Sequence, residues 1–372
     1  MNLLHLLPTL ERRGAQMFAR RLIAGLNGKG EVQQALAVLR PGGDEVGIGP
    51  LIPALRLLPP GGVVPKVLAL RKWLASIQPD VILAHGGGPL KYAVLARAGA
   101  ATPRIVYRKI GLTERWLGTR RWLKLPVQRW LVGQADAIST VGEATRREAI
   151  TLFHADPARV RVIYNGYSLE HFACPAGTRE RVRQSLGLSP ATRVLIAVGA
   201  LGWEKNQAAM LRVLAALRRA RPNLVLLIAG EGPERARLDS LTDQLAVRDA
   251  VCFLGVRKYV PDLLAAADLC ILTSLTEGVP GVLIEGGLAG LPCVSWDVAG
   301  AKEVVVHEAT GLITPFQDEP ALIAAVQRLL DDPALAARFG QAARQFCRDR
   351  FSIDTTLEAH FDLIRQICLE PS

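Results

Sequence analysis

The feature that most constrains this chain is an alternation of short apolar runs with amphipathic helical stretches, which occurs twice along its length. In the second half the apolar runs are nearly continuous, as in Leu224–Ala229, which is typical of parallel strands covered on both faces. Between the runs, apolar residues recur at helical spacing, as in Phe18, Leu22 and Leu26. This alternation predicts an α/β protein made of two doubly wound domains.

The expected strands are Leu3–Leu7, Ala35–Leu39, Val81–Ala84, Ile105–Arg108, Ala137–Thr140 and Val160–Tyr164 in the first half, and Val194–Val198, Leu224–Ala229, Val251–Leu254, Leu269–Thr273, Cys293–Ser295 and Leu312–Thr314 in the second. Proline and glycine near the middle of the chain predict a linker over residues 171–189. It would separate an N-terminal domain (residues 1–170) from a C-terminal domain (190–350), followed by a last helix (351–372). Ligands of such domains bind at the carboxyl ends of the strands, so we expect a cleft there.

The positive charge of the chain is concentrated in its first half. The net charge is +11, and the first 175 residues contain 24 Lys and Arg against 11 Asp and Glu. This half should therefore attract an anionic partner: a membrane surface, a phosphorylated lipid or a nucleic acid. No apolar run reaches the length of a membrane span, so we expect a cytoplasmic protein. Its six cysteines are widely spaced, and no Cys-x-x-Cys pair occurs. We therefore expect the cysteines to be reduced and to act as small apolar side chains.

The strongest motif runs from Thr273 to Pro292, TSLTEGVPGVLIEGGLAGLP. A strand is expected to end near Thr273, and a helix is expected to start near Val282 after the Gly-Pro turn. The free amides of Gly281, Val282 and Leu283 at this helix start would form an anion site that suits a diphosphate. Glu285 could accept hydrogen bonds from a ribose, and Glu277 from the hydroxyl groups of a sugar.

The spacing of Glu277 and Glu285 resembles the E-x7-E signature of family 4 of the retaining GT-B glycosyltransferases. Other segments resemble this family in the same order: RVIYNGYSLEHF (161–172), VGALGWEKN (198–206), IAGEGPE (228–234), FLGV (253–256) and ATGLI (309–313). The resemblance implies two Rossmann-like domains facing across a cleft, with C-terminal helices packing back toward the N-terminal domain. It also implies sugar transfer from a nucleotide diphosphate sugar with retention of the anomeric configuration. UDP is the default nucleotide because it is frequent in the family.

The resemblance also assigns roles to residues of the C-terminal half. Glu285 resembles the glutamate that binds the ribose, and Glu277 resembles the one that holds the donor sugar. Lys205 resembles the lysine that contacts the diphosphate, where a cation would stabilise the leaving group. Arg257 follows the turn at which the family holds the base, although a plain loop fits this segment equally well.

In the N-terminal half, Gly14 matches the glycine-rich loop of the family, which faces the diphosphate. His85 follows an expected strand and precedes three glycines, and it resembles the histidine that points at the donor sugar. We therefore expect His85, Lys205 and Glu277 to be the catalytic residues. Ala200 departs from the family, which has an arginine here. The loss of one charged phosphate contact could cost about 1.5–3 kcal/mol, unless Arg12, Arg13 or Arg257 substitutes.

Two absences in the sequence bear on cofactors. No Asp-x-Asp triplet occurs, so the usual metal–diphosphate clamp of the other large glycosyltransferase fold is missing. We expect no metal and no other cofactor. The dinucleotide fingerprint G-x-G-x-x-G is also missing, which disfavours a dehydrogenase.

Basic residues and tryptophans alternate between Arg108 and Trp130, a pattern that suits a membrane interface. The expected membrane or acceptor surface consists of Arg115, Trp116, Arg120, Arg121, Trp122 and Lys124. Alternatively, the tryptophans pack on the core and the cations are solvated. We expect an acceptor that is a glycan or is linked to a lipid, a protein peripheral to the inner face of the membrane, and no nucleic-acid partner.

Two other functions fit the sequence less well. One is a GT-B-like nucleotide-sugar epimerase. The other is a non-catalytic protein that binds a sugar nucleotide, for which Ala200 is the only indication. The sequence alone leaves the sugar, the linkage and the acceptor open.

Overall fold

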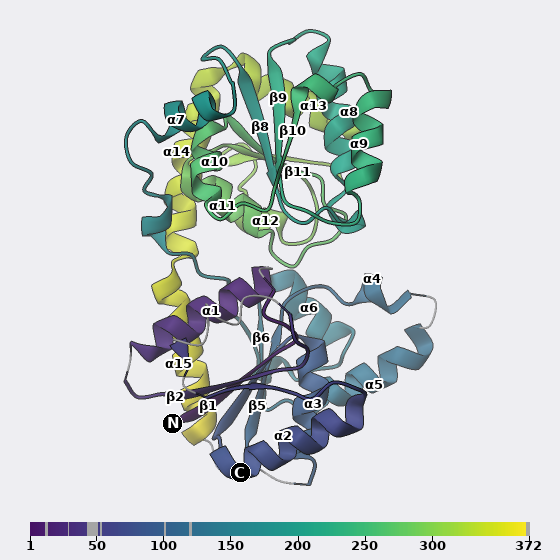
Figure 1. The fold of residues 1–372 in the computed structure, drawn as a ribbon, viewed down its shortest axis with the longest axis vertical. Helices are drawn as coiled ribbons and strands as arrows, with labels where there is room; N and C mark the ends of the chain where they lie inside the picture. Colours follow the sequence, from purple (N-terminus) through teal and green to yellow (C-terminus); the bar gives the residue numbers. More distant parts are fainter. Residues whose placement is uncertain are drawn as a thin grey trace. The chain divides into compact units, whose positions relative to one another are not determined.

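The computed structural model describes residues 1–11, 14–28, 30–42, 51–52, 54–99, 102–118 and 121–369. The chain forms two compact units (Figure 1). Unit 1 contains residues 1–166 and the segment from Ile353 onward, and unit 2 contains residues 167–352. Residues 171–189, expected to be a linker, lie in unit 2, where helix α7 (Thr178–Ser185) packs against α10 (Val260–Ala266).

Unit 1 is built on a parallel sheet with the strand order β3-β2-β1-β4-β5-β6-β7 among its described residues. Its strands are β1 (Asn2–Leu7), β2 (Gln33–Val38), β3 (Ala54–Leu57), β4 (Val81–His85), β5 (Arg104–Lys109), β6 (Ala137–Thr140) and β7 (Val160–Val162). Every strand expected in this half is confirmed. Strand β3 was not expected.

Helices cover both faces of this sheet, because successive strand residues point to opposite sides. The helices of unit 1 are α1 (Gly14–Asn27), α2 (Val63–Ile77), α3 (Gly87–Arg97), α4 (Glu114–Leu117), α5 (Arg121–Gly133), α6 (Glu143–Thr151) and α15 (Ile353–Leu369). Leu4 and Leu6 pack with α2 and α3, whereas Leu3 packs with α1 and α15. The C-terminal helix α15 (yellow in Figure 1) is therefore part of the core of unit 1.

Unit 2 has a parallel sheet with the order β10-β9-β8-β11-β12-β13. Its strands are β8 (Arg193–Val198), β9 (Leu224–Ala229), β10 (Val251–Gly255), β11 (Leu269–Leu272), β12 (Cys293–Trp296) and β13 (Gly311–Thr314). Its other helices are α8 (Gln207–Arg218), α9 (Arg235–Gln244), α11 (Gly281–Ala289), α12 (Ala301–Val304), α13 (Glu319–Asp331) and α14 (Pro333–Arg350). All strands expected here are confirmed, and two doubly wound domains are thus established.

Helix α11 packs closely on its neighbours because it contains two adjacent glycines. A Cβ atom on Gly286 would lie 3.1 Å from the Sγ of Cys293, and one on Gly287 would lie 2.5 Å from the Sγ of Cys347. Cys270 and Cys293 are buried and free, as expected of small apolar side chains. The hydrogen bond with the thiol of Cys270, together with burial, raises the pKa of Cys293 well above its ordinary value.

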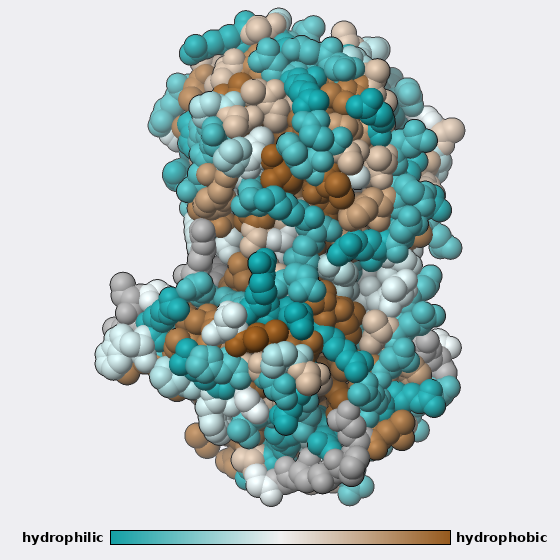
Figure 2. All heavy atoms as spheres, turned by 180° about the vertical axis from the view of Figure 1, so that it is seen from behind, coloured by the Kyte–Doolittle hydropathy of each residue, from teal (hydrophilic) through white to brown (hydrophobic). Residues whose placement is uncertain are grey.

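The surface of the molecule is mixed. On the face that Figure 2 shows, hydrophilic residues cover most of each unit, and hydrophobic residues form smaller groups among these hydrophilic residues. Over the residues that the structure describes, no helix has both the length and the apolarity needed to cross a membrane.

Candidate functional site

The candidate site lies at the carboxyl ends of two neighbouring strands of unit 2. Strands β8 and β11 pair directly in the middle of the sheet. The chain leaves β8 through a short 3-10 helix, Trp203–Lys205, and leaves β11 through a loop that ends at Pro280 before α11. Two loops that are far apart in the sequence are thereby brought together at one edge of the sheet.

Lys205 and Glu277 form an ion pair across these two loops. The Nζ of Lys205 donates to the Oε1 of Glu277 at 2.6 Å. The Lys205 side chain is 25% exposed and that of Glu277 is 11% exposed, so the pair is only partly open to solvent. The structure therefore brings together two of the three expected catalytic residues.

Hydrogen bonds between the loops hold this pair in place. The hydroxyl group of Thr273, which is fully buried, donates to the carbonyl oxygens of Asn206 at 2.9 Å and Lys205 at 3.3 Å. The backbone N–H of Leu275 donates to the carbonyl oxygen of Glu204 at 2.7 Å. Thr273 was expected only as a strand end, because the sequence does not show that the two loops are neighbours.

The start of α11, four residues after Glu277 in the chain, offers backbone donors. The cap residue, Pro280, has no side chain that could satisfy the first amides of the helix. The N–H of Leu283 donates to the carbonyl oxygen of Pro280 at 3.1 Å. Of the three amides expected to bind an anion, those of Gly281 and Val282 are thus the better placed.

Tyr167 is a residue of this site that sequence reasoning missed. A Cβ atom on Gly281 would lie 2.5 Å from the hydroxyl oxygen of Tyr167, so this side chain packs against the first residue of α11. The backbone N–H of Tyr167 donates to the carbonyl oxygen of Phe351 at 2.9 Å. The tyrosine stands within the matched segment 161–172, but its contact with α11 could not be read from that segment.

Glu285 and Arg257 lie on different elements. Glu285 is the fifth residue of α11, and its side chain is partly exposed. It therefore lies just past the first turn of the helix, whereas a helix start near Val282 would place it within the first turn. Arg257 is exposed on the loop after β10, the edge strand. Gly230, which follows β9, contacts the ends of both neighbouring strands. Its N–H donates to the carbonyl oxygen of Gly255, at the end of β10, at 2.9 Å. A Cβ atom on Gly230 would lie 1.9 Å from the carbonyl oxygen of Gly199, just after β8.

Two other expected residues, Gly14 for donor binding and His85 for catalysis, belong to unit 1. Gly14 is the first residue of α1. His85 ends β4 and is 1% exposed, and its Nε2 lies 3.2 Å from the Nδ1 of His5. Burial lowers the pKa of His85 well below 6.5, and the charges of neighbouring groups, including Arg108, lower it further. Arg12 and Arg13, named as substitutes for the missing arginine, lie outside the described residues.

The basic segment of unit 1 divides into a buried part and an exposed part. Arg108 and Lys109 at its start are buried, although a cationic run predicts a solvated surface. Arg108 donates to the Nε2 of His360 at 2.7 Å, and Lys109 forms an ion pair with Glu148. Partners that are distant in the sequence thus account for the two charges at the start of the basic segment.

Helix α5 carries the exposed part of the basic segment. Trp122 is 73% exposed and Trp130 is 52% exposed, with Leu123 and Val127 also exposed. Arg121 and Lys124 are exposed on the same helix, Arg121 next to Glu114 at 2.8 Å. The alternative that these tryptophans pack on the core is therefore wrong for Trp122 and Trp130. Arg120 and the side chains of Arg115 and Trp116 lie outside the description.

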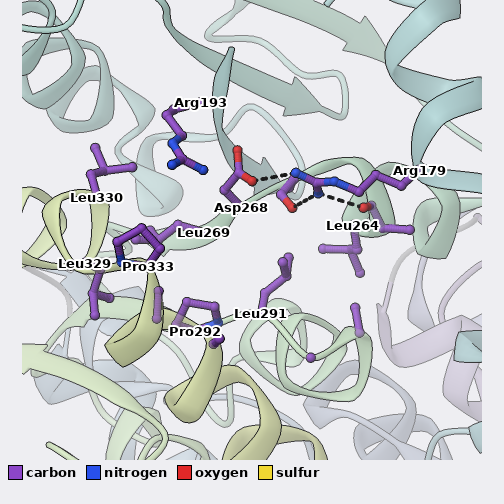
Figure 3. A pocket seen from close by; sticks show the side chains of 16 residues that line it. Arg179, Arg193, Leu264, Asp268, Leu269, Leu291, Pro292, Leu329, Leu330 and Pro333 are labelled. Atoms are coloured by element: carbon purple, nitrogen blue, oxygen red, sulfur yellow. Dashed lines mark hydrogen bonds and ion pairs between the residues drawn. The ribbon is translucent and has the colours of Figure 1, made fainter. Parts of the chain in front are cut away.

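A cavity of about 330 Å³ occurs at the opposite edge of the unit 2 sheet (Figure 3). It lies beside Arg193 and Leu269, which begin β8 and β11, and includes none of the expected site residues. Its Arg179 is bound to Asp268 at 2.6 Å and to carbonyl oxygens at the end of α10. Arg179 and Asp268 are thus already bound to partners within unit 2. We therefore place the functional site at the carboxyl ends of the strands and not in this cavity. In the part of the chain that the structure describes, no group of three or more His, Cys, Asp or Glu could hold a metal.

Two Rossmann-like units, with a lysine–glutamate pair beside a free helix start in the second, define a GT-B glycosyltransferase. The family model "Glycosyltransferase Family 4" matches residues 11–171, and "Glycosyl transferases group 1" matches residues 178–346. The D-inositol 3-phosphate glycosyltransferase of Kineococcus radiotolerans is 30% identical over 316 residues, which cover 79% of this chain and 68% of that protein. The chain therefore belongs to glycosyltransferase family 4.

A further relative supports this assignment, and a solved structure shows the same fold. The lipopolysaccharide core biosynthesis glycosyltransferase LpsD of Rhizobium meliloti is 34% identical over 170 residues, or 46% of this chain and 48% of LpsD. The structure of Anabaena HepE in complex with UDP-glucose has a TM-score of 0.89 at 21% identity, covering 98% of this chain and all of HepE. The chain is accordingly a nucleotide-sugar glycosyltransferase, and neither an epimerase nor a non-catalytic binding protein is favoured.

Proposed function

We propose that this enzyme transfers a sugar from UDP, with retention and without a metal, to a glycan or lipid-linked acceptor of the cell envelope. The observation that carries the proposal is the ion pair of Lys205 and Glu277, since Glu277 stands four residues before the start of α11. An ammonium group and free helix amides suit a departing diphosphate. In this arrangement the cation would perform the task of a metal ion.

Each residue has a role that its position supports. Lys205 and the amides of Gly281 and Val282 bind the diphosphate, and Glu277 presents its carboxylate to the hydroxyl groups of the sugar. Glu285, one turn into α11, binds the ribose, and Arg257 lies where the base is held by backbone groups. Within unit 1, Gly14 at the start of α1 and His85 at the end of β4 keep the donor-binding and catalytic roles that the family resemblance implies.

The choice of donor and acceptor draws on the relatives. LpsD acts in lipopolysaccharide core biosynthesis and HepE was solved with UDP-glucose, which favours a UDP-sugar and an envelope glycan. The test is a thermal-shift screen of UDP-, GDP- and ADP-sugars, followed by product analysis with the donor that binds. UDP-sugars should give the largest shift, because a bound ligand stabilises the folded state by mass action. A larger shift with another nucleotide would overturn the choice of UDP.

We further propose that α5 binds an anionic membrane on the cytoplasmic side. Exposed Trp122 and Trp130 with Arg121 and Lys124 on one helix suit the headgroup region. Each cation near an anionic surface contributes about 1 kcal/mol. Sedimentation with vesicles should show binding that requires anionic lipid and that is lost in W122A/W130A. The matched control is Trp203→Ala, an exposed tryptophan of unit 2; equal binding by all three proteins would refute the proposal.

A further inference from the structure

A chain of buried polar side chains crosses the sheet of unit 1 and ends at His85. His5, Gln34 and His85 stand on three neighbouring strands, and each is less than 10% exposed. His5 lies between the other two, with its Nε2 2.8 Å from the Oε1 of Gln34 and its Nδ1 3.2 Å from the Nε2 of His85. The Nδ1 of His85 is buried and has no hydrogen-bond partner among the described residues.

Gln34 fixes the direction of this chain. Its amide nitrogen donates to the carbonyl oxygen of Ile23 at 2.9 Å and to the side-chain oxygen of Asn27 at 2.6 Å. A backbone carbonyl only accepts hydrogen bonds, so the group that faces Ile23 must be the amide NH2. The Oε1 of Gln34 therefore faces His5, and it can only accept.

The protons of both histidines follow from that direction. The Nε2 of His5 must carry a hydrogen to donate to Gln34, which leaves its Nδ1 as an acceptor in the neutral ring. The Nε2 of His85 must then carry the hydrogen that is donated to His5. The opposite tautomer of His5 would set two acceptors against each other at 2.8 Å.

We propose that Gln34 and His5 are positioning residues that hold His85 in its Nε2–H tautomer, so that Nδ1 accepts a hydrogen bond from a sugar hydroxyl group. A buried acceptor without a partner is unfavourable, and a hydroxyl donor would satisfy it. The ligand part of this proposal rests on the proposed function and adds a chemical requirement: the ligand donates and His85 accepts.

The surroundings of His85 support this role. Burial lowers the pKa of His5 to about 4, and the pKa of His85 is also well below 6.5, so both rings are neutral at pH 7. Gly86, directly after His85, has a φ of +103°, and a Cβ atom on Gly88 would meet no heavy atom within 4 Å. Gly88 therefore borders open space three residues after His85, and the positive φ of Gly86 is a conformation that glycine adopts without strain.

His360 provides an internal comparison in the same unit. Its Nε2 accepts from Arg108 at 2.7 Å, and its Nδ1 lies 2.9 Å from the carbonyl oxygen of Thr356. A carbonyl accepts, so His360 must be the Nδ1–H tautomer. The geometry therefore requires opposite tautomers for His85 and His360.

The tautomers can be read directly by long-range 1H–15N NMR correlation on protein labelled with 15N-histidine, at pH 7. His5 and His85 should show the Nε2–H pattern and His360 the Nδ1–H pattern. In Q34L, His5 is released and the Nδ1–H form of His85 should increase. The control Q16L removes another buried glutamine of unit 1, which bonds Thr9, and should leave His85 unchanged. A protonated or Nδ1–H His85 in the unmodified protein would overturn the proposal, whatever the variants do.

The ligand contact is tested by adding UDP-glucose or UDP to saturation, with occupancy measured by calorimetry. The Nδ1 resonance of His85 should shift with UDP-glucose and remain in place with UDP, because only the first carries the sugar. Bound UDP-glucose without a shift, or equal shifts with both ligands, would refute the hydroxyl contact. Failure of every nucleotide sugar to bind would instead refute the proposed function, while the tautomers would still be measured.

Discussion

Replacing Lys205 with methionine should weaken both nucleotide binding and the stability of the fold. The methionine keeps most of the side-chain length and removes the charge. Loss of the ammonium group would remove one charge-assisted hydrogen bond to the diphosphate. Such a bond contributes about 1.5–3 kcal/mol, or roughly 10- to 150-fold in Kd. It also leaves the Glu277 carboxylate, 11% exposed, without its cation. We therefore expect a lower free energy of unfolding as well, by about 1–3 kcal/mol.

Unit 2 contains a matched control for this change. Lys302 pairs with Asp297 at 2.6 Å, the same distance as in the Lys205–Glu277 pair, but these side chains are 65% and 42% exposed. Exposed pairs contribute about 0–1 kcal/mol, so K302M should bind UDP like the unmodified enzyme and unfold almost normally. Calorimetric titration with UDP and urea unfolding measure both quantities. If K205M and K302M bound UDP equally well, Lys205 would not contact the diphosphate.

Three further predictions concern packing, protonation and the donor site. G287A places a methyl group 2.5 Å from the Sγ of Cys347; it should cost about 1–3 kcal/mol of stability, and adding C347A should recover part of this in urea unfolding. The folded pKa values of His5 and His360, about 4 and about 3, lie below the unfolded value of about 6.5. The unfolded chain therefore binds more protons than the folded chain as the pH falls, and these two rings together should remove about 3 kcal/mol of stability between pH 6.5 and 5; an unfolding midpoint that stays constant over this range would contradict their neutral burial. Ala200 is exposed, and A200R should tighten UDP binding roughly 10- to 150-fold by restoring a charged contact; unchanged affinity in calorimetry would show that no cation is missing there.

Most of the fold could be predicted because the parallel strands are nearly continuous apolar runs. The exception is β3, Ala54–Leu57, with the sequence ALRL and the pattern of an edge strand: two of its four residues are exposed. The sequence of such a short, half-exposed strand cannot be distinguished from that of a loop. The order of the strands in the sheet cannot be read from the sequence either, and this order makes β8 and β11 neighbours.

The candidate site was predicted in its residue types more than in its contacts. Lys205 and Glu277 were each expected at a loop, but their pairing depends on the sheet. The burial of Arg108 could not be predicted, because its partner His360 lies 252 positions further along the chain. Local sequence therefore indicates where charges can be functional, and distant partners determine which of them remain accessible.

The most direct test of the central claim is a crystal structure of the enzyme with bound UDP. The terminal phosphate should lie within hydrogen-bond distance of the Nζ of Lys205 and the amide of Val282, with the ribose on Glu285. UDP bound elsewhere, for example in the cavity beside Arg193, or a phosphate that does not contact Lys205 or α11, would contradict it.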